Sequence, residues 1–340
     1  MPPLEGTHIG LDSQTVGVFA LTATASFVID LWAHRADKPI ALKAAVCWSV
    51  FWVAVAMLFA LYLNLRFNPE VTSLFLAGYL FEQALSVDNL FVMMAIFAWF
   101  KVPDHLCHRV LYWGVLGAVL FRLIFVLIGA SLFALGPWVE LVFALLVGSS
   151  ALMMLKGKKN EEDKEQDLSQ HLAYRAVHRL LPVFPKFMGH NFFISKEEAA
   201  AALGSEESAA LKLNGKWLAT PLFLCLVIIE TTDVMFAFDS VPAVIAVSRE
   251  PLIIYSAMIF AVLGLRSMYF VLDALRRYLV HLEKAVTLLL FFIAFKLAAG
   301  ASLHLWGVGV DISVYTSLAI IAVILGLGVL SSLIFPAKRK

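Results

Sequence analysis

The chain contains repeated runs of about 20 apolar residues, and this pattern limits the folds that it can adopt. An α-helix of that length crosses the hydrocarbon core of a bilayer. Hydrophobic residues make up 61% of the 340 residues, whereas charged residues make up only 15%. The composition predicts an all-α membrane protein, because the strands of a membrane β-barrel alternate apolar and polar residues instead of forming continuous apolar tracts.

About nine membrane spans are expected. They lie near residues 14–32, 44–64, 71–99, 109–132, 137–155, 218–247, 251–272, 281–300 and 312–335. Short loops rich in Lys and Arg remain in the cytoplasm, and such residues follow the first, third and seventh spans and end the chain. We therefore expect the N-terminus outside and the C-terminus in the cytoplasm. Asp30 and Asp273 are predicted to be hydrated acids near cytoplasmic helix ends.

Five carboxylates interrupt two of these apolar spans. Glu82 and Asp88 lie in the third span, and Glu230, Asp233 and Asp239 lie in the sixth. Inserting one Asp at the centre of a membrane helix costs about 2.5–3.5 kcal/mol, so the acids require neutralisation. Ionisable residues at this depth usually mark an ion pathway or a proton relay. The alternative is that they only form salt bridges that hold the helices together.

Three basic residues in the predicted spans are candidate counter-ions, namely Arg122, Arg266 and Lys296. If every group is ionised, the five acids and three cations leave a formal charge of −2. One divalent cation would cancel that charge. The basic residues themselves are expected to bridge the acids.

The spacing of the acids predicts that both spans are broken helices. Glu82 and Asp88 are six residues apart, as are Asp233 and Asp239. Six residues at about 100° each place the second acid far around a regular helix from the first. Both acids of a span would face one midplane cavity only if the helix were interrupted between them.

Polar residues and a proline mark where these interruptions are expected. Ser86 and Asn89 lie in the third span, and Ser240 and Pro242 lie in the sixth. A broken helix exposes carbonyl oxygens, which together with carboxylates form an oxygen site suited to Mn²⁺, Mg²⁺ or Ca²⁺. Ser86, Asn89 and Ser240 are candidate additional ligands of such a metal.

The two acidic spans also resemble each other. EQALSVDNLFV occupies residues 82–92 and DVMFAFDSVPA occupies residues 233–243, and the next spans carry AVLFR ending at Arg122 and AVLGLR ending at Arg266. If spans three to five and six to eight are repeats, their odd number of helices inverts the second relative to the first. Secondary transporters with inverted repeats bind substrate near the midplane. Chance similarity is the alternative for matches this short.

The predicted repeats divide the chain into five parts. These are a tail with two spans at 1–69, the first repeat at 70–155, a cytoplasmic loop at 156–216, the second repeat at 217–300, and a last span with a basic tail at 301–340. Within the loop, NFFI and NGKW are predicted to be extended, and Lys196–Leu211 has helical composition. The loop is either a solvated connector or a small appendage that docks or gates.

Several functional classes lack their sequence signals. The chain has neither a G-x-x-x-x-G-K-[ST] phosphate loop nor an H-E-x-x-H motif, so neither ATP hydrolysis nor simple zinc-hydrolase chemistry is expected. Cys47, Cys107 and Cys225 form no C-x-x-C pair. The net charge of +1 does not indicate a nucleic-acid partner. We expect no enzymatic activity and no resident cofactor.

The motifs EQALSVDNLF, IETTDVMFAFDSVPA and NGKWLATPLF resemble the TerC/Alx family of bacterial membrane proteins. The resemblance implies an inner-membrane protein of the LysE-like transporter superfamily that is associated with metal homeostasis, chiefly Mn²⁺ export, and with tellurite resistance. The family's motif acids correspond here to Glu82, Asp88, Glu230, Asp233 and Asp239. The alanine-rich stretch at 197–210 departs from the family pattern, because it is longer than the usual loop.

The leading hypothesis is a secondary transporter that exports Mn²⁺ through the acidic site. Moving two charges outward against 100 mV costs about 4.6 kcal/mol, and proton antiport is the expected source of energy. The alternative is a tellurite-resistance or redox-stress component that recruits soluble partners through residues 156–216. An intramembrane metal enzyme is a third class, but the sequence indicates no substrate for one.

Overall fold

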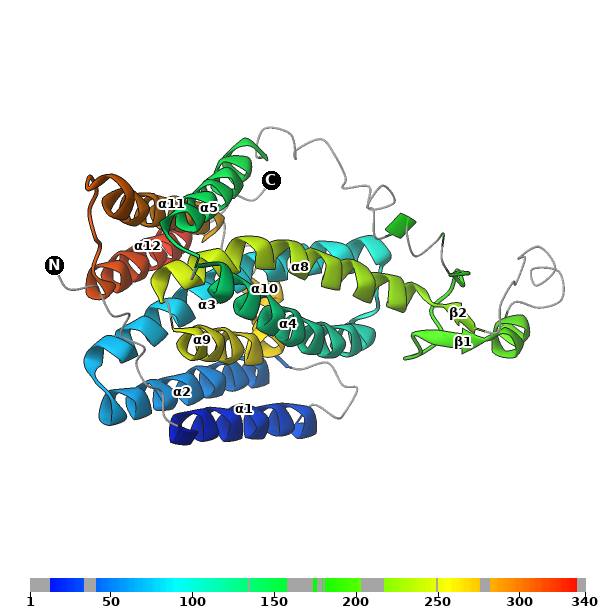
Figure 1. Cartoon of the computed structure of the whole chain (residues 1–340). Coiled ribbons are helices and arrows are strands. Elements are labelled where there is room, and N and C mark those ends of the chain that lie inside the picture. The colour runs from blue at the N-terminus through cyan, green and yellow to red at the C-terminus, as the bar shows by residue number, and fades with distance from the viewer. Residues whose placement is uncertain are drawn as a thin grey trace.

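The computed structural model describes residues 13–33, 41–133, 135–157, 174–175, 179, 181–202, 217–248, 250–275 and 282–334. Most of these residues are helical (Figure 1). The elements are α1 (Ser13–Ala33), α2 (Leu42–Arg66), α3 (Pro69–Phe100), α4 (Asp104–Phe133), α5 (Pro137–Gly157), β1 (Phe193–Ser195), β2 (Trp217–Ala219), α8 (Pro221–Val247), α9 (Pro251–Leu263), α10 (Leu265–Leu275), α11 (Leu282–Trp306) and α12 (Val314–Ile334). The basic C-terminal tail lies outside the described residues.

Each of the nine predicted spans coincides with a helix or, in one case, with the pair α9 and α10. Six described helices are long and apolar enough to cross a membrane, namely α2, α3, α4, α8, α11 and α12. The number is seven if α9 and α10, which are bent by 49° at their junction, form one broken span. The all-helical membrane class is therefore confirmed, but the count of nine spans is not.

The predicted interruptions of the third and sixth spans are wrong for the backbone. The helix α3 is continuous through Ser86 and Asn89, and α8 is continuous through Pro242. Proline lacks the amide hydrogen that would bond the carbonyl four residues earlier, but neighbouring helices allow membrane helices to tolerate this loss. The described break falls at Gly264, between α9 and α10.

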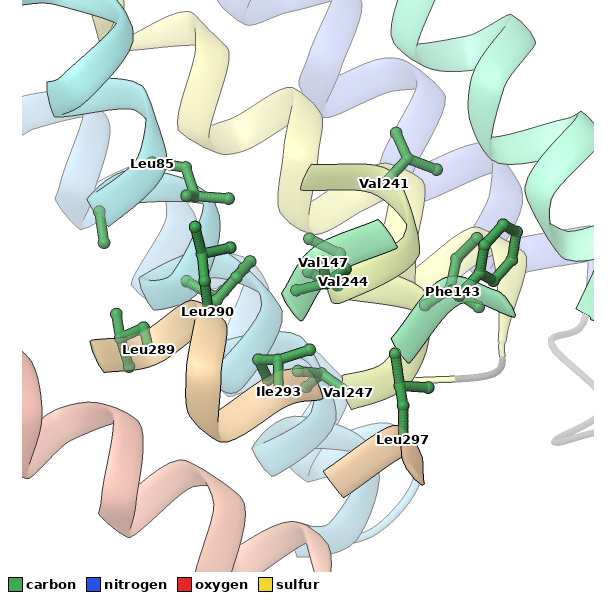
Figure 2. Close-up of a cluster of buried hydrophobic side chains, with 14 of the residues drawn as sticks. Leu85, Phe143, Val147, Val241, Val244, Val247, Leu289, Leu290, Ile293 and Leu297 are labelled. Carbon is green, nitrogen blue, oxygen red and sulfur yellow. The ribbon is translucent and has the colours of Figure 1, made fainter. Parts of the chain in front are cut away.

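The core of the protein is built where α3, α5, α8 and α11 meet. Leu289, Leu290, Ile293 and Leu297 of α11 belong to one buried cluster, in which Ile293 and Leu297 lie on the side of α5 and α8 (Figure 2). Water does not drive helices together inside a bilayer, so close van der Waals packing supplies much of the attraction there. Around this core α3 contacts α8 and α9. The helix α4 lies along α8, and α5 lies along α11.

The two acidic helices run in opposite directions. Gly78 of α3 lies close to Val244 of α8. Farther along α3, Leu90 lines the same small cavity as Ile229 of α8, so residue numbers rise along one helix as they fall along the other. This antiparallel arrangement allows Glu82, near the middle of α3, to lie at the depth of Asp233, near the middle of α8.

A small polar appendage extends from the end of the bundle at which α8 begins (Figure 1). Strands β1 and β2 pair in antiparallel register, with Ile194 opposite Leu218. These two side chains form a buried cluster with Phe184 and Ala199, and residues 196–202 are helical. The extended segments predicted at NFFI and NGKW are therefore confirmed in their described part, while the helix predicted beyond residue 202 lies outside the described residues.

The appendage is attached to the helices at specific points. The hydroxyl of Thr220, immediately before α8, donates a hydrogen bond of 2.8 Å to the carbonyl of Asn191. The guanidinium of Arg109 on α4 lies over the ring of Phe192, 5.3 Å from its centre. These contacts hold the appendage against the ends of α4 and α8.

Candidate functional site

Arg122 of α4 joins two of the predicted acids at the centre of the bundle. Its Nη1 forms an ion pair with Oε1 of Glu82 on α3. Its Nη2 lies 3.7 Å from Oδ1 of Asp233 on α8. All three residues are buried, with exposed fractions of 1%, 0% and 3% in that order. A single guanidinium therefore connects three helices.

This charge cluster is poorly supplied with hydrogen bonds. Apart from these contacts with Arg122, both carboxylate oxygens of Glu82 and of Asp233 are buried without a hydrogen-bond partner among the described residues, as is Nε of Arg122. The hydroxyl of Ser86, one turn after Glu82, is also buried without a hydrogen-bond partner among the described residues. Buried ion pairs recover their desolvation cost only when further hydrogen bonds complete them. The cluster is therefore costly, and its oxygens retain lone pairs for a cation.

Glu230 lies one turn before Asp233 on α8 and faces α4. Its carboxylate rests against Gly117, where any side chain would collide with it. A side chain at position 117 would therefore require the carboxylate of Glu230 to move. Oε2 of Glu230 is also buried without a hydrogen-bond partner. Together with Arg122, the three acids whose side chains are described carry a formal charge of −2 when ionised.

The remaining two acids are placed by the backbone alone. Asp88 lies within α3 and Asp239 within α8, but the structure does not describe their side chains. Six helical residues rise about 9 Å. Because α3 and α8 are antiparallel, Asp88 is displaced from Glu82 toward one membrane face, and Asp239 is displaced from Asp233 toward the other. The acids thus follow one another across the bundle over about 18 Å.

This arrangement differs from the single cavity expected from the sequence. The side chains that the structure describes include no group of three or more His, Cys, Asp or Glu residues placed to hold a metal ion. Ser86, Asn89 and Ser240 are buried on the same two helices, and the hydroxyl of Ser240 has no hydrogen-bond partner among the described residues. The structure brings Glu82, Glu230 and Asp233 to the interface of α3, α4 and α8.

Arg266 does not take the position expected of a counter-ion to the five acids. Its Nη2 donates hydrogen bonds to Oδ2 of Asp30, at 2.7 Å, and to the carbonyl of Asp30, at 2.8 Å. The prediction that Asp30 is a hydrated surface acid is therefore wrong, since this residue is only 8% exposed. The pair lines a cavity of about 150 Å³ with Phe27, Tyr112, Val115 and Leu116.

Another buried acid escaped the sequence reasoning. Glu140 lies in the first turn of α5 and is 5% exposed. Its Oε2 faces α11 at Gly300, one turn beyond Lys296, the third predicted counter-ion. An acid beside Pro137 at the start of an apolar run resembles an ordinary helix-capping residue, so only the packing of α5 on α11 reveals its burial.

The bundle, its apolar exterior and its buried charges define a multi-pass integral membrane protein. The family model described as "Integral membrane protein TerC family" matches residues 67–340, so the chain belongs to the TerC family. The chain is 56% identical to "Tellurium resistance protein TerC" of Serratia marcescens over 98% of its own length and 97% of that protein.

Two further relatives carry two different descriptions. The chain is 33% identical to "Putative membrane-bound redox modulator Alx" of Salmonella typhi, over 83% of its own length and 84% of that protein. A second tellurium resistance protein, from an Alcaligenes species, is 55% identical over 98% of the chain and 97% of that relative. No solved structure matches the chain.

The pair between Asp30 and Arg266 predicts a measurable loss of stability on mutation. Asp30→Asn leaves the guanidinium of Arg266 buried without its carboxylate, a change that typically costs about 3–5 kcal/mol. We expect a lower thermal unfolding temperature in detergent and partial recovery in Asp30→Asn/Arg266→Gln. Asp273→Asn, at an exposed acid on the helix of Arg266, is the control. Equal stability of Asp30→Asn and Asp273→Asn would contradict the importance of the pair.

Proposed function

We propose that this protein exports a divalent metal ion, first of all Mn²⁺, across the bacterial inner membrane by secondary transport. The observation that carries the proposal is the buried cluster in which Glu82 and Asp233 both approach Arg122 and have no other hydrogen-bond donor among the described residues. Metal is the substrate in this proposal and not a resident cofactor, and no bond of the substrate is made or broken.

The packing of the helices supports an inverted repeat of α3 to α5 and α8 to α11. In such a repeat α3 corresponds to α8, α4 to the pair α9 and α10, and α5 to α11. Under this correspondence the contact of α3 with α9 is equivalent to the contact of α8 with α4. The contacts of α3 with α8 and of α5 with α11 convert into themselves. The same exchange relates Glu82 to Asp233, which both approach Arg122. Alternating access would move one repeat against the other around these acids.

The proposed route follows the order of the acids across the bundle. With the N-terminus outside and the C-terminus inside, Asp88 lies nearest the cytoplasm and Asp239 nearest the exterior. Glu82, Glu230 and Asp233 lie between them. Ser86, Asn89 and Ser240 are additional candidate oxygen ligands, and Pro242 leaves the carbonyl of residue 238 without an amide partner. Oxygen ligands suit Mn²⁺, Mg²⁺ and Ca²⁺.

Metal export against an interior-negative potential needs a source of energy, and we propose proton antiport. Export of one divalent ion against 100 mV costs about 4.6 kcal/mol. The carboxylates that bind the metal are also groups that accept protons.

Neutralising the central acids is expected to weaken metal binding. Glu82→Gln and Asp233→Asn each remove a carboxylate that the structure places beside Arg122. Binding of Mn²⁺ to purified protein, followed by electron paramagnetic resonance of the free ion, should weaken by about tenfold or more, as when one partner of a buried charge contact is removed. Glu140→Gln, a buried acid on α5, is the matched control. Binding unchanged by both central substitutions would show that the site is misplaced.

Proton antiport predicts a dependence of transport on the pH gradient. Proteoliposomes loaded with Mn²⁺ should release it faster when the imposed gradient drives protons in the opposite direction, and a proton ionophore should remove the difference. Liposomes that contain Glu82→Gln protein are the control for leakage. Efflux that is indifferent to the gradient would eliminate the antiport mechanism while leaving metal transport in place.

The alternative proposal is a membrane scaffold for soluble partners in tellurite or redox stress. The names of the relatives favour it, and so does the appendage, in which Trp217 is 62% exposed and Phe193 is 40% exposed. Exposed aromatic side chains of this kind are common in protein interfaces.

The two proposals predict opposite effects of two kinds of mutation on tellurite resistance. Asp88→Asn and Asp239→Asn should abolish resistance that depends on transport but not resistance that depends on a scaffold. Ile194→Asp places a charge in the buried cluster of the appendage and should abolish scaffold function. Glu197→Ala, at an exposed position nearby, is the control. Growth on tellurite, with membrane abundance measured in parallel, distinguishes the outcomes.

A further inference from the structure

We propose that Arg122 is a tethered substitute for the metal ion, which occupies the site whenever the carrier is empty and so permits its return. This inference rests on the proposed export function and assigns a step within it. It begins from the position of the guanidinium, which lies where a cation bridging Glu82 and Asp233 would lie.

The two acids that Arg122 contacts belong to different halves of the protein. Glu82 precedes Arg122 in the same half, on α3, whereas Asp233 lies on α8 in the other half. The guanidinium therefore makes one ion pair within its half and one contact across the interface at 3.7 Å. A metal ion that bridges the same carboxylates would make the same connection. The guanidinium and the metal cannot occupy this position together, because they would repel each other at contact distance.

The contacts of Arg122 are those of a displaceable group. A guanidinium held permanently between carboxylates usually forms paired, short hydrogen bonds. Here Nη1 contacts Oε1 of Glu82, but Nη2 lies 3.7 Å from Oδ1 of Asp233, and Nε has no hydrogen-bond partner among the described residues. Charge attraction at long range, and not a pair of short hydrogen bonds, thus holds the guanidinium to Asp233. A divalent ion has twice the charge and can coordinate both carboxylates, so it can displace the guanidinium.

An exporter must return empty after each release, and the buried acids make this step difficult. Without a cation, Glu82, Glu230 and Asp233 would be three like charges inside a bilayer, which is strongly unfavourable. Arg122 neutralises part of that charge from within the protein. The protons of the proposed antiport neutralise the remaining charge, so the carrier needs no external metal ion to reorient, and net transport becomes possible. Removing Arg122 should leave a carrier that can reorient only while it is loaded.

The test compares Arg122→Gln, Arg122→Lys and Arg109→Gln in proteoliposomes. Arg109 lies on the same helix but outside the buried cluster, where it contacts Phe192. Two quantities are measured with radioactive Mn²⁺. One is net efflux into metal-free buffer, and the other is exchange against unlabelled Mn²⁺ outside. Affinity for Mn²⁺ is measured separately on purified protein, together with the unfolding temperature.

The expected result for Arg122→Gln has two parts. Mn²⁺ should bind about tenfold more tightly or better, because a competing like charge is gone. Net efflux should be lost while exchange persists. Arg122→Lys keeps the charge but cannot bridge two carboxylates with a fork, so its values should lie between those of wild type and Arg122→Gln. Arg109→Gln should match wild type in net efflux, exchange and affinity for Mn²⁺.

Opposite results would overturn the inference. Unchanged or weaker Mn²⁺ binding by folded Arg122→Gln protein, or net efflux at the wild-type rate, would exclude a substitute role. If Arg122→Gln does not fold, Arg122→Ala purified with methylguanidinium takes its place. Removal of methylguanidinium should then tighten Mn²⁺ binding. Binding that does not tighten would also exclude the substitute role. A wild-type protein that neither binds nor transports Mn²⁺ would refute the export proposal itself, which separates the two failures.

Discussion

The position of one arginine side chain determines how the centre of this protein is arranged. A charged guanidinium inside a bilayer is costly unless carboxylates lie close to it, and carboxylates at the same depth need a cation in turn. Arg122 satisfies this requirement on three helices at once, since its partners lie on α3 and α8. A change in the spacing of α3, α4 and α8 would separate these charges.

The sequence was informative wherever a residue contradicts its surroundings. Carboxylates in apolar runs were recognised as members of one site, and Glu82, Glu230 and Asp233 do meet at one interface. The helices were predicted well because apolar runs of membrane length have few alternative structures. The extended segments of the appendage followed from their aromatic residues and adjoining turn.

The sequence was less informative about which charges pair. Arg266 contacts Asp30, which is 236 residues away along the chain, and no local pattern predicts that partner. The burial of Glu140 depends likewise on the docking of α5 against α11. Pro242 was misread because a proline usually interrupts a helix in water, while α8 remains helical within the bundle. In each case the deciding factor is a neighbouring helix that is distant in sequence.

The contact of Glu230 with Gly117 restricts how α4 and α8 can slide past each other. One turn earlier on α4, Gly114 lies close to Ile229 and also lacks a side chain that would obstruct the carboxylate. Two neighbouring positions of α4 that face α8 are therefore glycines, and a shift of one turn, about 5 Å, would carry the carboxylate of Glu230 from Gly117 to Gly114 without meeting a side chain.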